Sequence, residues 1–65
     1  YAQAADAYRQ AVTIDPNFGD AHYGLACSLY MLEQYDLAWS HVNTARRLGT
    51  SVPDEQIRAM QNKVR

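Results

Sequence analysis

Apolar residues recur every three or four positions through most of this 65-residue chain, and that spacing predicts helices. The first apolar stripe consists of Ala4, Tyr8, Ala11 and Ile14. It predicts an amphipathic helix over residues 1–14, which ends before Pro16 because the residue before a proline is pushed out of the α region. The same spacing returns further on and predicts a helix over residues 35–48, with the stripe Ala38, Val42, Ala45 and Leu48.

The segment 21–32 has too many apolar residues for one stripe, so we expect this helix to be buried on two sides. One of its faces consists of His22, Leu25, Ala26, Leu29 and Leu32. The other consists of Asp20, Tyr23, Gly24, Cys27, Tyr30 and Met31. Only Glu33 and Gln34 separate this helix from the next, so the two helices should pack antiparallel.

A last helix is expected over residues 53–65, with Pro53 at its first helical position and Ser51 or Val52 as its N-cap. Its apolar stripe is narrow and consists of Ile57, Met60 and Val64. A helix with one side to bury and one side to expose is suited to the end of a helical stack.

Comparison of the chain with itself shows a period of 34 residues, which aligns the helix at 1–14 with the helix at 35–48. Tyr1, Ala4 and Ala11 recur identically as Tyr35, Ala38 and Ala45, and Tyr8 and Ile14 recur in kind. Helix–turn–helix units of 34 residues are the signature of tetratricopeptide repeats, and the chain resembles that family.

The family's small–aromatic–small pattern with a closing proline is matched by Ala4, Tyr8, Ala11 and Pro16. Leu25 with Ala26 resembles its Leu-Gly pair. Three positions depart from the pattern: His22 replaces a large residue, Glu33 a turn glycine, and Thr50 the closing proline.

The resemblance implies an all-α, right-handed helical solenoid of about one and a half repeats plus a capping helix. We expect residues 1–16 to be the second helix of a partial repeat, 17–50 a complete repeat, and 51–65 the cap. About three units are usually needed to bury a solenoid's faces. Further upstream repeats, or a homo-oligomer in which another copy covers the first helix, are therefore expected.

First helices of such repeats line a concave groove that binds a peptide or a partner helix. Transferred to this sequence, that groove consists of Asp20, Tyr23, Gly24, Cys27, Tyr30 and Met31. The resemblance therefore implies a non-catalytic protein-interaction or scaffold module. The alternative is a structural module permanently buried in a larger complex or fused to an enzyme. A carboxylate clamp is not expected, because Tyr23, Gly24 and Cys27 stand where its Lys, Asn and Arg are needed.

Charge is divided unevenly along the chain: residues 1–45 have five acidic residues against Arg9, and residues 46–65 have five basic residues against Asp54 and Glu55. With a net charge of −1 there is no general attraction to nucleic acid, so we interpret the basic end as a solvated surface. No apolar run has the ~20 residues that a membrane helix needs. Protein partners are therefore expected, not nucleic acid or membrane.

The sequence offers no convincing catalytic or metal site, and we expect no cofactor. Cys27 is the single cysteine, so the chain has no internal disulfide. His22 and Cys27 are five residues apart and diverge around the helix, and a zinc site needs three or four ligands. We interpret His22 and His41 as side chains packed between helices and Cys27 as a partly buried thiol without a general base.

Overall fold

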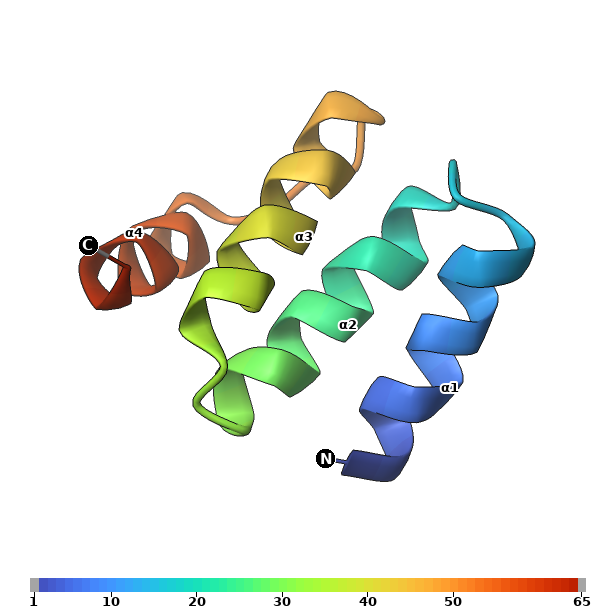
Figure 1. Ribbon diagram of the computed structural model, residues 1–65. Helices are drawn as coiled ribbons and strands as arrows, with labels where there is room; N and C mark the ends of the chain where they lie inside the picture. The colour runs from blue at the N-terminus through green and yellow to red at the C-terminus, as the bar shows by residue number, and fades with distance from the viewer. Residues whose placement is uncertain (1, 65) are drawn as a thin grey trace.

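The computed structural model describes residues 2–64, which form four helices and no strand: α1 (Ala2–Ile14), α2 (Gly19–Met31), α3 (Tyr35–Arg47) and α4 (Asp54–Lys63). Figure 1 shows α1, α2 and α3 side by side, with successive helices running in opposite directions. The expected all-α arrangement of helical hairpins is confirmed. Tyr1 and Arg65, at the outer ends of the expected first and last helices, lie outside the described residues.

The centre of the fold is α2, as its two apolar faces predict. Seven of its residues are buried, against three in α3 and one each in α1 and α4. Leu25 and Leu29 of α2 pack in one core cluster with Ala38 and Val42 of α3. Burial of one Leu side chain stabilises a fold by roughly 1.5–3 kcal/mol, so this α2–α3 hairpin contributes most of the core.

The face by which α1 contacts α2 differs from the predicted stripe. Ala5 is the buried residue of α1, and half-buried Val12 packs against the same core. Ala4 and Tyr8 of the stripe are exposed instead, and Ile14 at the helix end is 85 % exposed. The spacing therefore identified an apolar face of α1 that this chain leaves largely uncovered.

The ends of α2 and α3 are built alike. After α2, the N–H groups of Glu33 and Gln34 donate to the carbonyls of Tyr30 and Leu29. After α3, those of Gly49 and Thr50 donate to Arg46 and Ala45 in the same pattern. This is the Schellman motif, in which the residue directly after the helix C-cap has a positive φ. Glu33 has φ 64° and Gly49 has φ 91°.

Two helix starts differ from the sequence prediction. The helix α2 begins at Gly19, because Phe18 is extended and its carbonyl accepts from Ala21 and His22. Pro53 is the N-cap of α4 and not its first helical residue, since its ψ of 139° is extended. The cap role expected of Ser51 or Val52 is therefore wrong, and no side chain caps this helix.

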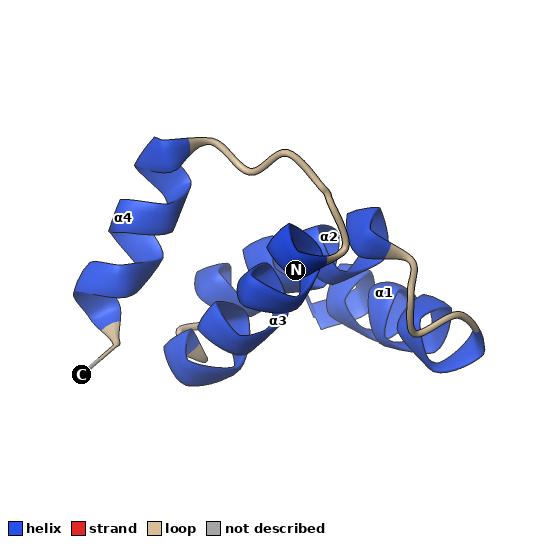
Figure 2. Ribbon diagram, turned by 90° about the horizontal axis from the view of Figure 1, so that it is seen from above, coloured by secondary structure: helices blue, strands red, loops and turns tan. Residues whose placement is uncertain are grey.

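The helix α4 stands apart from the layer formed by the other three helices, and a loop from α3 leads over to it (Figure 2). Met60 is its buried contact, with Ile57 and Val64 half-buried. The 34-residue period aligns α4 with α2 and places Met60 at the position of Ala26. Ala26 is small enough to lie in the α2–α3 core. Met60 has a longer side chain, and α4 packs less closely on α3 than α2 does.

Candidate functional site

A hollow of about 540 Å³ opens between α1 and α2. Side chains of both helices line it: Ala4, Tyr8, Asp20, Tyr23, Gly24, Cys27, Ser28 and Met31. We call this set the α1/α2 groove. Its lining is mostly apolar, and Asp20 is its one charged residue. Such a surface is suited to binding apolar side chains of a partner.

Five of the six residues expected in the groove line this hollow: Asp20, Tyr23, Gly24, Cys27 and Met31. Sequence reasoning missed Ala4, Tyr8 and Ser28. The apolar stripe of α1 could have indicated Ala4 and Tyr8, because the residues 34 positions later in the same stripe, Ala38 and Val42, are fully buried. The corresponding stripe of α1 is exposed and supplies the second wall of the hollow.

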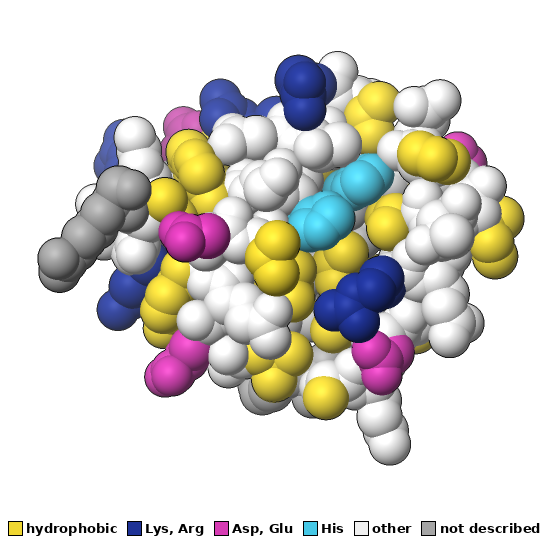
Figure 3. All heavy atoms as spheres, viewed as in Figure 1, with side chains coloured by type: hydrophobic (Ala, Val, Ile, Leu, Met, Phe, Trp, Pro, Cys, Tyr) yellow, Lys and Arg dark blue, Asp and Glu magenta, His cyan; other side chains and the backbone are white. Residues whose placement is uncertain are grey.

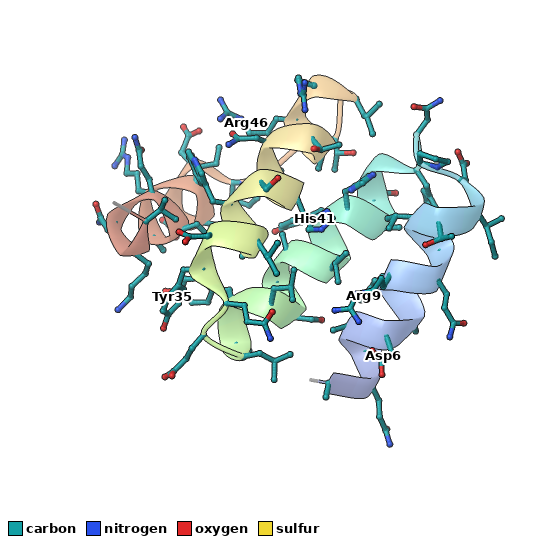
Figure 4. The ribbon with its side chains drawn as sticks, in the orientation of Figure 1. Asp6, Arg9, Tyr35, His41 and Arg46 are labelled. Atoms are coloured by element: carbon teal, nitrogen blue, oxygen red, sulfur yellow. The ribbon has the colours of Figure 1, made fainter. Side chains whose placement is uncertain are left out.

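Tyr30, the sixth expected residue, lies elsewhere. Its ring meets the ring of Tyr35 edge-on, with centroids 5.3 Å apart. The ammonium group of Lys63 lies 5.6 Å from the centre of the Tyr35 ring, on the side of α4. Figure 4 shows Tyr35 at the start of α3, on the side of α4 and away from α1. Tyr30 therefore supports the α2–α3 turn and lies outside the α1/α2 groove.

At Gly24 the Tyr8 ring of α1 packs directly against α2. A Cβ added at Gly24 would lie 2.5 Å from two atoms of the Tyr8 ring, closer than packed carbon atoms come. The missing side chain thus makes room for the Tyr8 ring against the α2 backbone. Gly24 fixes the position of Tyr8, which remains 38 % exposed on the groove side.

Tyr23 and Cys27 connect the groove to α4. The Tyr23 hydroxyl donates a hydrogen bond to Oε1 of Gln56, and the Cys27 Sγ lies 3.8 Å from the same oxygen. Burial raises the pKa of Tyr23, and the neighbouring Cys27 raises it further. Burial also raises the pKa of the Cys27 thiol, although its hydrogen bond with Tyr23 opposes that change. Cys27 is therefore a protonated, weakly nucleophilic thiol at neutral pH.

The two histidines lie together between α2 and α3. Their Nδ1 atoms are 3.1 Å apart, and Nε2 of His22 is 2.8 Å from the carbonyl oxygen of Pro16. In Figure 3 they form the single histidine patch on the face shown. Across residues 2–64, no group of three His, Cys, Asp or Glu side chains is placed to hold a metal ion. The pair has a packing role in the α2–α3 hairpin.

In the part of the chain that the structure describes, no helix is long and apolar enough to cross a membrane. Comparison of the chain with curated proteins and with solved structures gives no significant match. A family model described as "Tetratricopeptide repeat" matches residues 7–40, just over half of the chain. The match spans one 34-residue period, from α1 through α2 into α3, and so includes both walls of the groove. The chain belongs to the tetratricopeptide repeat family.

Proposed function

We propose that this chain is a protein-interaction module that binds its partner in the α1/α2 groove. Membership of the family implies a role in protein–protein interaction in general, and tetratricopeptide repeats are typically non-catalytic. The groove is where the open apolar stripe of α1 meets the exposed face of α2. We further propose that residues 1–16, 17–50 and 51–65 are the partial repeat, the complete repeat and the cap of this module.

One observation supports this assignment above the others. Five residues of α2 that the family resemblance assigns to the groove line a hollow of about 540 Å³ together with the exposed Ala4 and Tyr8 of α1. Tyr8 and Tyr23 supply large and rigid rings, a residue type enriched among binding hot spots. Because the hollow exists before any partner arrives, little ordering free energy is lost on binding.

The test compares Met31→Glu with Leu37→Glu. Met31 lines the groove and is 53 % exposed, whereas Leu37 lies on α3 outside the groove and is 51 % exposed. Both variants should retain the helical circular-dichroism spectrum, since each changes an exposed side chain. In affinity capture from the source cell, Met31→Glu should lose a partner that Leu37→Glu retains. Equal loss in both variants, or in neither, contradicts the groove assignment.

A structural module permanently covered in a larger assembly is the second candidate. It is favoured by the exposure of Ile14 and Phe18 at the α1–α2 junction, where two large apolar side chains face water. In that case, added free chain should not replace the chain bound to the captured partner within hours. With a transient partner, the replacement should take minutes.

A further inference from the structure

We infer that His22 and His41 together bind a soft monovalent metal ion of the Cu⁺ class through the Nδ1 atoms of their two rings. The site lies between α2 and α3, away from the α1/α2 groove, so the inference does not depend on the proposed function. The sequence argued against a metal site by comparing His22 with Cys27 of the same helix. The fold brings His22 to His41 of α3 instead.

The first argument is the way in which the two rings face each other. Their Nδ1 atoms are 3.1 Å apart, and the ring centres are 5.3 Å apart, close to the greatest separation that such a contact allows. The rings therefore meet edge to edge, with an angle of 27° between their planes. The lone-pair directions of the two Nδ1 atoms lie nearly on one line. A metal ion on that line has its two nitrogen ligands on opposite sides.

This geometry selects the kind of metal ion. Zn²⁺ requires lone pairs that converge in a tetrahedron, and it takes at least three ligands from the protein. Within residues 2–64, no third His, Cys, Asp or Glu is placed to complete such a set. Cu⁺ and Ag⁺ accept two ligands on a line, and imidazole nitrogen is a suitable donor for copper. The pair therefore matches a two-coordinate monovalent ion and not a tetrahedral divalent one.

The second argument is that the backbone holds His22 in the tautomer that a metal ion needs. Nε2 of His22 lies 2.8 Å from the carbonyl oxygen of Pro16, a group without a proton, so the ring proton stays on Nε2. Nδ1 of His22 then presents its lone pair toward His41. Metal-bound histidines are typically held by this kind of hydrogen bond from the other ring nitrogen to a carbonyl or carboxylate.

His41 can exchange the proton that the metal ion replaces. Within residues 2–64 no hydrogen bond engages its Nε2, and no buried side-chain nitrogen there lacks a partner, so this atom reaches solvent. On binding, the proton on Nδ1 of His41 leaves to water, Nε2 takes up a proton from water, and two nitrogen–metal bonds form. Neither a net proton nor an electron is transferred. Burial lowers the pKa of His41, which keeps the ring neutral and able to bind a metal ion at neutral pH.

The ion needs a small opening between the rings and a path to it. Two nitrogen–metal bonds of about 2 Å place the nitrogens ~4 Å apart, so the rings must separate by ~1 Å. His41 is half-buried and can make this movement, while His22 keeps its hydrogen bond to Pro16. Figure 3 shows both rings at the molecular surface, so an ion enters directly from solvent.

The test uses Ag⁺, a redox-stable substitute for Cu⁺, and the Cys27→Ala chain, in which no thiol competes for the ion. Calorimetry measures the affinity, and nitrogen NMR of the histidine rings identifies the atoms that bind. We expect one Ag⁺ per chain, with shifts at Nδ1 of both rings. Adding His41→Gln removes one of the two ligands and should weaken binding roughly tenfold or more. Adding Arg9→Gln should strengthen it, because the Arg9 charge lies near His41 and opposes a cation.

Equal affinity with and without His41→Gln overturns the inference, and so does the absence of Ag⁺ binding to the Cys27→Ala chain. Shifts at Nε2 in place of Nδ1, or centred on the exposed Met31, also overturn it. Zn²⁺ that binds the pair as tightly as Ag⁺ overturns the assignment to a two-coordinate ion. If His41→Gln loses the helical circular-dichroism spectrum, the ring-nitrogen shifts decide the question, because they are measured with both histidines in place.

Discussion

His22 and His41 share one hydrogen bond between their Nδ1 atoms, 3.1 Å apart, and its direction is fixed by Pro16. The Pro16 carbonyl can only accept, so Nε2 of His22 carries a proton. Neutral His22 then has a lone pair at Nδ1, and the Nδ1–H of His41 donates to it. An extra proton on Nε2 of His41 leaves this bond intact.

The burial of His41 makes the stability of the chain sensitive to acid. Burial lowers the pKa of His41 below its ordinary value of 6.5, and the nearby His22 and Arg9 lower it further. Figure 4 shows His41 on α3 and Arg9 on α1, the two helices that flank α2. The unfolded chain therefore binds a proton at His41 near pH 6.5, whereas the folded chain binds it only at lower pH. The contribution of His41 to the free energy of unfolding is fully present above about pH 6.5 and is lost as the pH falls below it.

Urea unfolding between about pH 7.5 and pH 5.5 measures this effect while most carboxylates remain ionised. We expect the free energy of unfolding to fall over this range in the wild type. His41→Gln, which cannot be protonated, should show a smaller slope. Identical slopes in the two proteins contradict the role assigned to His41.

Glu33 and Gly49 occupy the same position in two equivalent helix ends, and only Gly49 suits it. A residue with a Cβ loses about 1 kcal/mol at positive φ relative to glycine. We expect Glu33→Gly to raise the free energy of unfolding by about 0.5–1 kcal/mol, although glycine also makes the unfolded chain more flexible. Gly49→Ala should lower it by about 1 kcal/mol. Thermal unfolding measures both, and a destabilising Glu33→Gly contradicts this account of the turn.

The contact between Gly24 and Tyr8 predicts that the two positions are coupled in a double-mutant experiment. Gly24→Ala gains ~1 kcal/mol in helix propensity but forces the exposed Tyr8 ring to swing aside, which offsets part of that gain. In a Tyr8→Ala background the collision is absent, so Gly24→Ala should raise the free energy of unfolding by more than it does in the wild type. Thermal unfolding of the four proteins measures this coupling, and additive effects of the two substitutions contradict it.

Cys27 offers a chemical measure of groove occupancy. Because burial raises its pKa, iodoacetamide should modify Cys27 more slowly in the folded chain than in the urea-unfolded chain at the same mildly alkaline pH. A partner or peptide in the α1/α2 groove should slow the reaction further. Mass spectrometry follows the modification with time. A folded chain that reacts as fast as the unfolded one contradicts the burial of this thiol.

The sequence predicted the helices well because their apolar spacing repeats over three turns or more. It placed α2 at the centre for a sound reason, since a helix apolar on two faces needs two neighbours. The starts of α2 and α4 were less well predicted. Both are decided by one extended residue, Phe18 and Pro53, whose backbone angle depends on the loop as a whole.

The groove could be predicted in part, because the resemblance to tetratricopeptide repeats indicates which face of α2 lines it. The resemblance identified the side chains of α2 but not the wall contributed by α1, since that wall depends on how the two helices face each other. Tyr30 shows why a helical face alone does not define the groove. It lies two turns after Tyr23 at nearly the same angle around α2, but there its neighbour is Tyr35 instead of α1.

The order of the helices has a consequence for how this chain unfolds. Most contacts between helices join sequence neighbours, α1 with α2, α2 with α3 and, more loosely, α3 with α4, while Gln56 adds a link from α4 to Tyr23 of α2. Cooperativity then passes from neighbour to neighbour, as in a one-dimensional lattice, and the terminal helices open before the central pair. With Ala5 as its buried residue, α1 should exchange its amide hydrogens early. A partner bound in the α1/α2 groove contacts α1 as well as α2, so it should delay the exchange of the α1 amides.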